Sequence, residues 1–251
     1  YFMQFEIVLV RLCLLLLHNN VYMTEMNKKF FFIILSIFTY FCDRVSAQNY
    51  QALRDSLSKA TEALSYKPDS LDLRLKKAGW NILLEQWQYA RDEYDFVLKQ
   101  DPNNIAALFY RAFVNEKQKR YNFARLDYEN LIKIVPYHFE ARLGLALLNH
   151  KDKHFTEALN QINKLVELYP DSAIVYAARA GMEMDHKHYE LAEFDYSKAI
   201  ELEPENNNYR LNRINVQIIL KRKDDARNDL DILVRKGIPR ANLAEYYMKC
   251  K

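Results

Sequence analysis

The stretch ELEPENN, residues 201–207, places Pro204 between a segment with helical periodicity and a polar turn. Four other prolines lie in similar surroundings at intervals of 34 residues, and the sixth and last follows after 35. These prolines are Pro68, Pro102, Pro136, Pro170 and Pro239. Proline lacks a backbone N–H and clashes with a preceding helical turn, so it is tolerated between helices and not within them. The period therefore predicts tandem helix-turn-helix units with one proline between successive units.

Alignment on this period, with proline at repeat position 32, defines five repeats. They are residues 71–104, 105–138, 139–172, 173–206 and 207–241. Position 20 is alanine in all five: Ala90, Ala124, Ala158, Ala192 and Ala226. Position 8 reads Ala78, Ala112, Ala146, Ala180 and Ile214. Small residues at these positions allow the two helices of a unit to approach closely where they cross.

The pattern resembles the tetratricopeptide repeat, whose consensus has a small residue at position 8, alanine at 20, an aromatic residue at 24 and proline at 32. Position 24 here reads Tyr94, Tyr128, Ile162, Tyr196 and Leu230. The resemblance covers residues 71 to about 241, with a half unit over 50–70 and a capping helix over 241–249. It implies an all-α fold, a right-handed α-solenoid of about five and a half repeats.

Charged residues at positions 7 and 23 provide a separate indication of how the helices pack. The pairs are Lys77/Glu93, Arg111/Asp127, Arg179/Asp195 and Arg213/Asp229. In the third repeat both positions are uncharged, with Leu145 and Gln161. Since charge occurs at both positions or at neither, we expect each pair to meet between the two helices of one repeat.

The N-terminal 47 residues are predicted to lie outside the repeat fold. We assign no function to residues 1–25, which are consistent with a wrongly assigned start of translation. Residues 26–47 have the features of a secretory signal peptide: Lys28 and Lys29, an apolar run over 30–41, and small residues before Gln48. The prediction is an exported protein, periplasmic or outer-membrane-associated in a bacterium. Two alternatives stay open, a lipid attached to Cys42 and an uncleaved membrane anchor.

Composition and motifs exclude several classes of function. The formal net charge of +3 predicts no nucleic-acid-binding surface. The sequence lacks a phosphate-binding glycine loop, a nucleophile elbow and an HExxH motif, so we expect neither an enzyme nor a cofactor. His150, His154, His186 and His188 recur near the turns of two repeats, and we interpret them as solvated turn residues in preference to a metal site. Cys250 is predicted to be free, and one hypothesis is that it links two chains.

In the family that the sequence resembles, the first helix of each repeat lines the concave face, which binds partner peptides. The corresponding positions imply a partner-binding set: Leu75, Phe109, Phe113, Leu143, Leu147, Ala177, Gly181, Met184 and Leu211. Large residues in repeats two and three stand next to Ala177 and Gly181 in repeat four, which predicts an apolar pocket there. In the competing interpretation, many of these residues pack in the core between neighbouring repeats and do not bind a partner.

Some members of the family use a clamp of Lys, Asn and Arg side chains to hold the C-terminal carboxylate of a chaperone. The positions of that clamp are occupied here by Leu75, Gly79, Tyr110, Glu140 and Gly144, so we expect no such ligand. The resemblance thus implies a non-enzymatic scaffold or adaptor that binds a protein or peptide partner through its concave face. The alternatives are a self-associating structural protein and an accessory subunit of an envelope or cell-wall enzyme complex.

Overall fold

The structure, a computed structural model, describes residues 50–251. The chain divides into two compact units, 1–58 and 59–251, and the packing reported below lies within the second. The predicted signal peptide over 26–47 lies outside the described residues. Residues 50–66 form a helix, and no helix from residue 50 onward is long and apolar enough to cross a membrane.

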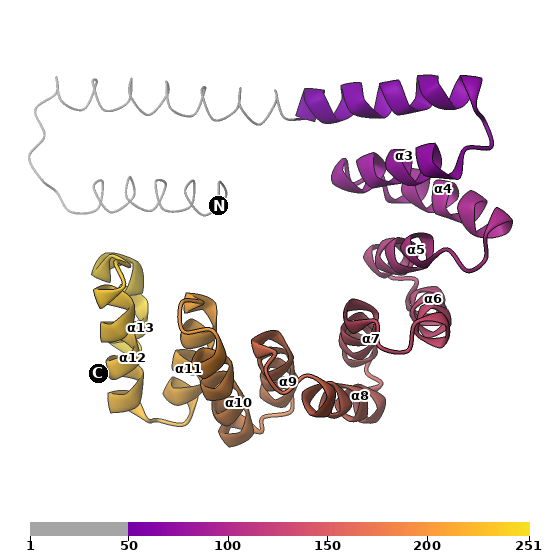
Figure 1. Cartoon of the computed structure of the whole chain (residues 1–251). Coiled ribbons are helices and arrows are strands. Elements are labelled where there is room, and N and C mark those ends of the chain that lie inside the picture. Colours follow the sequence, from indigo (N-terminus) through magenta and orange to yellow (C-terminus); the bar gives the residue numbers. More distant parts are fainter. Residues whose placement is uncertain (1–49) are drawn as a thin grey trace, which may run out of the picture. The chain divides into compact units, whose positions relative to one another are not determined.

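The described part of the second unit is a row of helical hairpins with no strand. The first helices of the five hairpins are α3 (Leu71–Leu83), α5 (Ile105–Lys117), α7 (Phe139–Lys151), α9 (Ala173–Asp185) and α11 (Asn207–Ile219). The second helices are α4 (Trp87–Gln100), α6 (Tyr121–Ile134), α8 (Phe155–Leu168), α10 (Tyr189–Leu202) and α12 (Lys223–Arg235). Each helix packs against the next in chain order (Figure 1). First and second helices each begin at intervals of 34 residues, as the proline period predicts.

Contacts between first helices of neighbouring repeats give the row a layered arrangement. α3 also contacts α5, and α7 also contacts α9, in addition to their own hairpin partners. The first helices therefore form one layer, here called the first-helix layer (Figure 1). Stacked hairpins in which each repeat contacts its neighbours are the defining feature of an α-solenoid, which confirms the predicted fold class.

Short polar segments determine where the first helices begin. Each proline at position 32 lies in the turn before a first helix, two residues ahead of its N-cap. Three of these N-cap side chains accept a hydrogen bond from the third residue that follows: Ser70, Asn104 and His138. A capping acceptor satisfies one of the N–H groups that an α-helix leaves unpaired at its start.

The first helices end in a turn that is the same in every repeat. The residue at position 15 has a positive φ between 55° and 63° in Glu85, Lys119, Lys153, Lys187 and Lys221. The next residue donates its N–H to a carbonyl five residues back, as in the 2.8 Å bond from Arg120 N to Asn115 O. This is a Schellman motif, which usually carries glycine at the left-handed position. Non-glycine residues in all five turns are a source of backbone strain.

The small residues at positions 8 and 20 lie at the centre of each hairpin, as predicted. All five alanines at position 20 and all five residues at position 8 are fully buried. Alanine at both positions brings the helix backbones together, and the larger residue at position 24 fills the space beside them, as Tyr94 and Tyr128 do.

The predicted charge pairs form within the hairpins. Arg111 donates two hydrogen bonds to Asp127, at 2.6 and 2.9 Å, and the same geometry holds for Arg179 with Asp195. Lys77 and Glu93 lie 2.7 Å apart, and Arg213 contacts Asp229 at 2.7 Å. In the third repeat, Gln161 accepts a hydrogen bond from Asn149 at 2.9 Å and replaces the ion pair.

The C-terminal end of the row is closed by a short 3-10 turn over Arg240–Leu243 and by α13, Ala244–Lys249. Cys250 is fully buried in the cluster that contains Leu230 and Leu243. Burial raises the pKa of its thiol, which keeps the less reactive protonated form. The hypothesis of a disulfide link between two chains through Cys250 is therefore wrong for the folded state.

Candidate functional site

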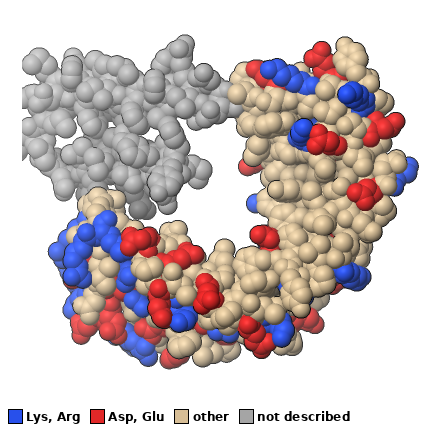
Figure 2. Space-filling view, in the orientation of Figure 1, with Lys and Arg blue, Asp and Glu red and all other residues tan. Residues whose placement is uncertain are grey.

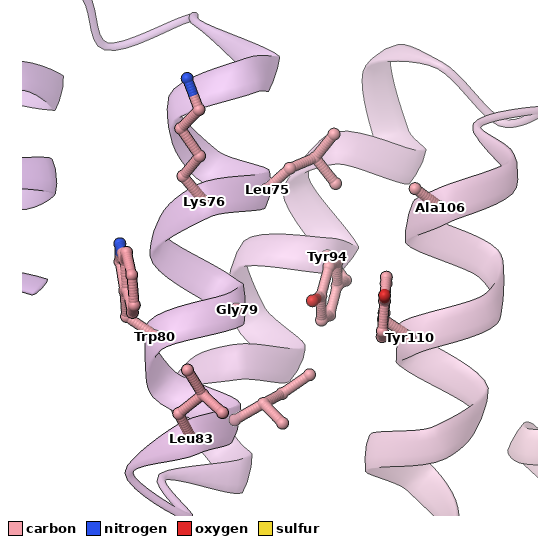
Figure 3. A pocket seen from close by; sticks show the side chains of 9 residues that line it. Leu75, Lys76, Gly79, Trp80, Leu83, Tyr94, Ala106 and Tyr110 are labelled. Carbon is pink, nitrogen blue, oxygen red and sulfur yellow. The ribbon is translucent and has the colours of Figure 1, made fainter. Parts of the chain in front are cut away.

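An apolar pocket of about 400 Å³ lies between α3, α4 and α5 (Figure 3). Its lining is Leu75, Lys76, Gly79, Trp80, Ile82, Leu83, Tyr94, Ala106 and Tyr110. α3 supplies six of these residues, and Figure 3 shows Leu75 on the side of the tyrosine rings, whereas Lys76 and Trp80 point away from them. A pocket of this size with a mostly apolar wall accepts one or two large apolar side chains.

The pocket exists because a glycine stands where neighbouring repeats place larger side chains. A Cβ added to Gly79 would meet no atom within 4 Å, so the space above it is open. The equivalent residues in the next two repeats are Phe113 and Leu147. Glycine at position 9 therefore leaves a depression in the first repeat, and larger side chains fill the equivalent space in the second and third repeats.

Two tyrosine rings form the opposite wall of the pocket. Tyr94 and Tyr110 lie nearly parallel, with ring centroids 6.2 Å apart and an interplanar angle of 14°. Tyr94 is buried, whereas Tyr110 is 47% exposed. Burial, and then the neighbouring Tyr110, raises the pKa of Tyr94, so the phenol stays neutral. The wall is therefore uncharged.

The charged side chains around the pocket are compensated within the chain. Lys76 pairs with Asp72 at 2.7 Å, one helical turn away. Further along the first-helix layer, Lys151 pairs with Glu116 at 3.0 Å. Figure 2 shows mainly uncharged side chains over α5 to α7 on the face in view, while charged ones gather toward α10 to α13. The pocket thus offers apolar contact with little uncompensated charge.

The residues predicted to bind a partner are distributed between this pocket and the interior. Leu75 lines the pocket. Phe109 and Phe113 are half-buried, and their rings pack on Tyr128 at 6.0 Å and on Trp87 at 6.2 Å. Phe113 therefore packs between repeats one and two, whereas Phe109 packs within its own hairpin.

The remaining predicted residues come from repeats three to five. Leu143 is 8% exposed and belongs to the core, whereas Leu147, one turn later on α7, is 44% exposed. Ala177 and Met184 are half-buried against α10, and Leu211 is half-buried against α12. At Gly181, which shares repeat position 9 with Gly79, the space beside the Cα is also open.

Sequence reasoning missed Trp80, Leu83 and Tyr110 as lining residues. They occupy repeat positions 10, 13 and 6, whereas the predicted partner-binding residues occupy positions 5, 9 and 12. Leu83 is 58% exposed, which is unusual for a leucine beside an apolar pocket. A large apolar residue at position 6 or 13, next to a glycine at position 9, is the signal that would have located the pocket.

The histidines lie between repeats three and four. His154 and His188 are exposed, as expected of solvated turn residues. His150 and His186 are half-buried, their rings are 5.8 Å apart, and each has a buried Nε2 atom without a hydrogen-bond partner. For these two the interpretation as solvated residues is wrong. Within residues 50–251, no group of three or more His, Cys, Asp or Glu side chains is arranged to hold a metal ion.

No protein-family model matches the chain, and no curated protein matches it. Among solved structures, it is similar to a tetratricopeptide repeat protein from Parabacteroides merdae at 20% identity, over 83% of this chain and 80% of that one, with a TM-score of 0.62. PilF of Pseudomonas aeruginosa matches at 19% identity over 82% of this chain and 91% of its own, with a TM-score of 0.61.

A third similar structure is YrrB, described as a TPR protein with an unusual peptide-binding site. It matches at 16% identity over 68% of this chain and 89% of its own, with a TM-score of 0.52. Identities at this level establish the fold and leave the ligand open. The chain therefore has a tetratricopeptide-repeat-like fold, built from tandem helical hairpins with a period of 34 residues.

Proposed function

We propose that the protein is a non-enzymatic interaction scaffold whose first-helix layer binds an uncharged, apolar segment of a partner protein, with an anchor side chain in the Gly79 pocket. The observation that carries this proposal is the pocket itself: about 400 Å³, apolar walls, and an exposed Leu83 and Tyr110 at its rim. Exposed apolar side chains around a concavity are typical of protein interaction sites.

The charges of the first-helix layer support the choice of an uncharged segment. Lys76 and Lys151 each have an acidic partner within the chain, and Lys117 lies 5.1 Å over the ring of Phe113. A charged ligand group buried against this wall would lose its hydration without gaining a free counter-charge. An apolar side chain gains from the same burial.

The similar structures also support a scaffold. They are repeat proteins of the same fold, and one is described as having a peptide-binding site.

The sequence features of residues 26–47 extend the proposal to the location of the protein. We propose that it is exported in a bacterium and acts in the periplasm or at the outer membrane. N-terminal sequencing of the protein from its source is expected to begin at Gln48, and a retained leader would contradict export by this route.

Trp80 provides a direct reading of pocket occupancy. The chain has two tryptophans, so a Trp87→Phe background leaves Trp80 as the sole emitter. We would titrate the whole chain with the uncharged peptide acetyl-Ser-Leu-Phe-Leu-Ser-amide and follow the Trp80 emission. A saturable blue shift is expected, because a bound apolar side chain displaces water from the indole.

Gly79→Leu and Gly181→Leu form a matched pair of controls. Both add a side chain at repeat position 9 where the space is open, but only the first fills the pocket. The emission change is expected to disappear in Gly79→Leu and to remain in Gly181→Leu. Equal changes in both variants, or none in the parent chain, would contradict the proposed site.

A further inference from the structure

A second concavity of about 210 Å³ lies between α4, α5 and α6, and we call it the α6 notch. Its wall includes Arg91 from α4, Asn115 from α5, and Arg120, Phe123 and Leu126 from the start of the second hairpin's second helix. It shares no lining residue with the Gly79 pocket. The notch is therefore a separate site.

The rim of the α6 notch is apolar although the fold does not require it. Phe123 is 54% exposed and Leu126 is 50% exposed, and their spacing of three places them on one face of α6. The same positions in the third repeat are Glu157 and Asn160, on a helix of equal length. Because a polar pair serves the same fold there, Phe123 and Leu126 are not needed for packing.

An uncompensated positive charge lies beside this rim. The Arg120 guanidinium lies over the Phe123 ring, 4.3 Å from its centroid, and makes no ion pair within the described residues. Lys119 precedes it, is exposed, and likewise has no ion pair among residues 50–251. The neighbouring Arg111 differs, because Asp127 and Asp95 both bind it, at 2.6 and 2.7 Å.

The wall of the notch also contains a hydrogen-bond acceptor that lacks a donor. Asn115 is 3% exposed; its Nδ2 donates to Asp127 at 3.2 Å, but its Oδ1 has no partner. In the third repeat the equivalent Asn149 accepts a 2.8 Å bond from Nε of Arg125. Arg91, the counterpart of Arg125, donates to Gln118 instead. A buried carbonyl without a donor is unfavourable, and a ligand N–H would correct it.

These three features define one ligand chemistry. We propose that the α6 notch is a second docking site, which binds a short partner segment carrying an apolar side chain next to a carboxylate. The apolar side chain packs on Phe123 and Leu126, and the carboxylate pairs with Arg120. A backbone N–H of the segment donates to Asn115 Oδ1. The positive charge at the rim selects an acidic segment, in contrast to the uncharged segment proposed for the Gly79 pocket.

The test uses the whole chain and the peptide acetyl-Gly-Leu-Phe-Asp-Gly-amide, with a second peptide in which Asn replaces Asp. Nuclear magnetic resonance would follow the side-chain signals of Asn115 and Arg120 and the methyl groups of Leu126. Saturable shifts are expected at millimolar peptide, with binding about tenfold weaker for the Asn peptide, because it loses a charge-assisted pair.

Phe123→Ser and Arg120→Gln change exposed or half-exposed side chains, and Phe194→Ser is a matched control with a ring that is 66% exposed on α10. Unchanged thermal unfolding would show that each variant is folded. The shifts are expected to disappear in Phe123→Ser, to weaken about tenfold in Arg120→Gln, and to persist in Phe194→Ser.

The proposal would be overturned by the absence of a saturable shift, by equal binding of the Asp and Asn peptides, or by equal loss of the shifts in Phe123→Ser and Phe194→Ser. Shifts confined to residues of the Gly79 pocket would also overturn it, while leaving the proposed function intact.

Discussion

Gly144 in α7 gives the buried ring of Tyr128 in α6 the space that it occupies: a Cβ at residue 144 would lie 2.9 Å from Tyr128 Cζ. The Gly144→Ala variant is therefore expected to lose about 1–3 kcal/mol in free energy of unfolding, because the ring is 3% exposed and cannot move away. Urea unfolding measures this loss. Unchanged stability would show that Tyr128 has room to move away from residue 144.

Replacing Gly79 or Gly181 by alanine is expected to raise stability, in contrast to Gly144→Ala. No atom lies within 4 Å of an added Cβ at either position. Gly79→Ala and Gly181→Ala are each expected to gain about 0.5–1 kcal/mol in free energy of unfolding, since alanine loses less backbone entropy in a helix. A loss at either position, measured in the same urea series, would mean that the open space is absent in solution.

Replacing a turn residue that has a positive φ by glycine is expected to stabilise the turn between the two helices of a repeat. Lys153 has a φ of 63°, a conformation that costs a residue with a Cβ about 1 kcal/mol. Lys153→Gly is expected to raise the free energy of unfolding by up to about 1 kcal/mol, after the greater flexibility of glycine in the unfolded chain is deducted. Lys164→Gly, in the middle of α8, is the control and is expected to lose about 1 kcal/mol.

The Arg111–Asp127 pair predicts a non-additive pair of substitutions. Arg111→Leu leaves the Asp127 carboxylate, 1% exposed, without its cation and is expected to cost about 3–5 kcal/mol. Arg111→Leu/Asp127→Gln reproduces Leu145 and Gln161 of the third repeat, and Asn115 can then donate to the new amide as Asn149 does. The double variant is expected to be more stable than the single one. A double variant that is less stable would contradict this account.

Buried tyrosines predict a loss of stability at alkaline pH. Burial raises the pKa of Tyr94 and of Tyr128 in the folded state. Below the ordinary tyrosine pKa of about 10, both phenols are neutral in the folded and in the unfolded chain, and their burial stabilises the fold in full. As the pH rises from about 10 through the raised folded pKa, the unfolded phenols ionise first, so the free energy of unfolding falls. Tyr94→Phe/Tyr128→Phe is expected to reduce the loss of stability between about pH 9 and about pH 11. An unchanged loss of stability in the double variant would contradict raised pKa values in the folded state.

The sequence predicts the fold well because each signal recurs in several repeats. The alanines at positions 8 and 20 and the charges at positions 7 and 23 describe contacts inside one hairpin, and the proline spacing marks where one hairpin ends and the next begins. Such contacts follow from helical spacing alone. The hairpin geometry was therefore accessible from the sequence.

The candidate site was less accessible, because exposure depends on how neighbouring repeats cover one another. Leu143 and Leu147 are four residues apart on α7, yet one is 8% and the other 44% exposed. The pocket requires both the missing side chain at Gly79 and the position of Tyr110 in the next repeat. The sequence predicted a pocket at Gly181, where the space beside the Cα is indeed open. It did not predict the wall that Tyr94 and Tyr110 form beside the first repeat.

The central claim is that the Gly79 pocket binds a partner, and photo-crosslinking in the living cell tests it most directly. Leu83→p-benzoylphenylalanine places a photoreactive ring at the rim, where the native side chain is 58% exposed. We predict a crosslinked partner that is lost when Gly79→Leu is added and kept when Gly181→Leu is added. A crosslink that survives Gly79→Leu unchanged would contradict the claim that the pocket holds the anchor side chain.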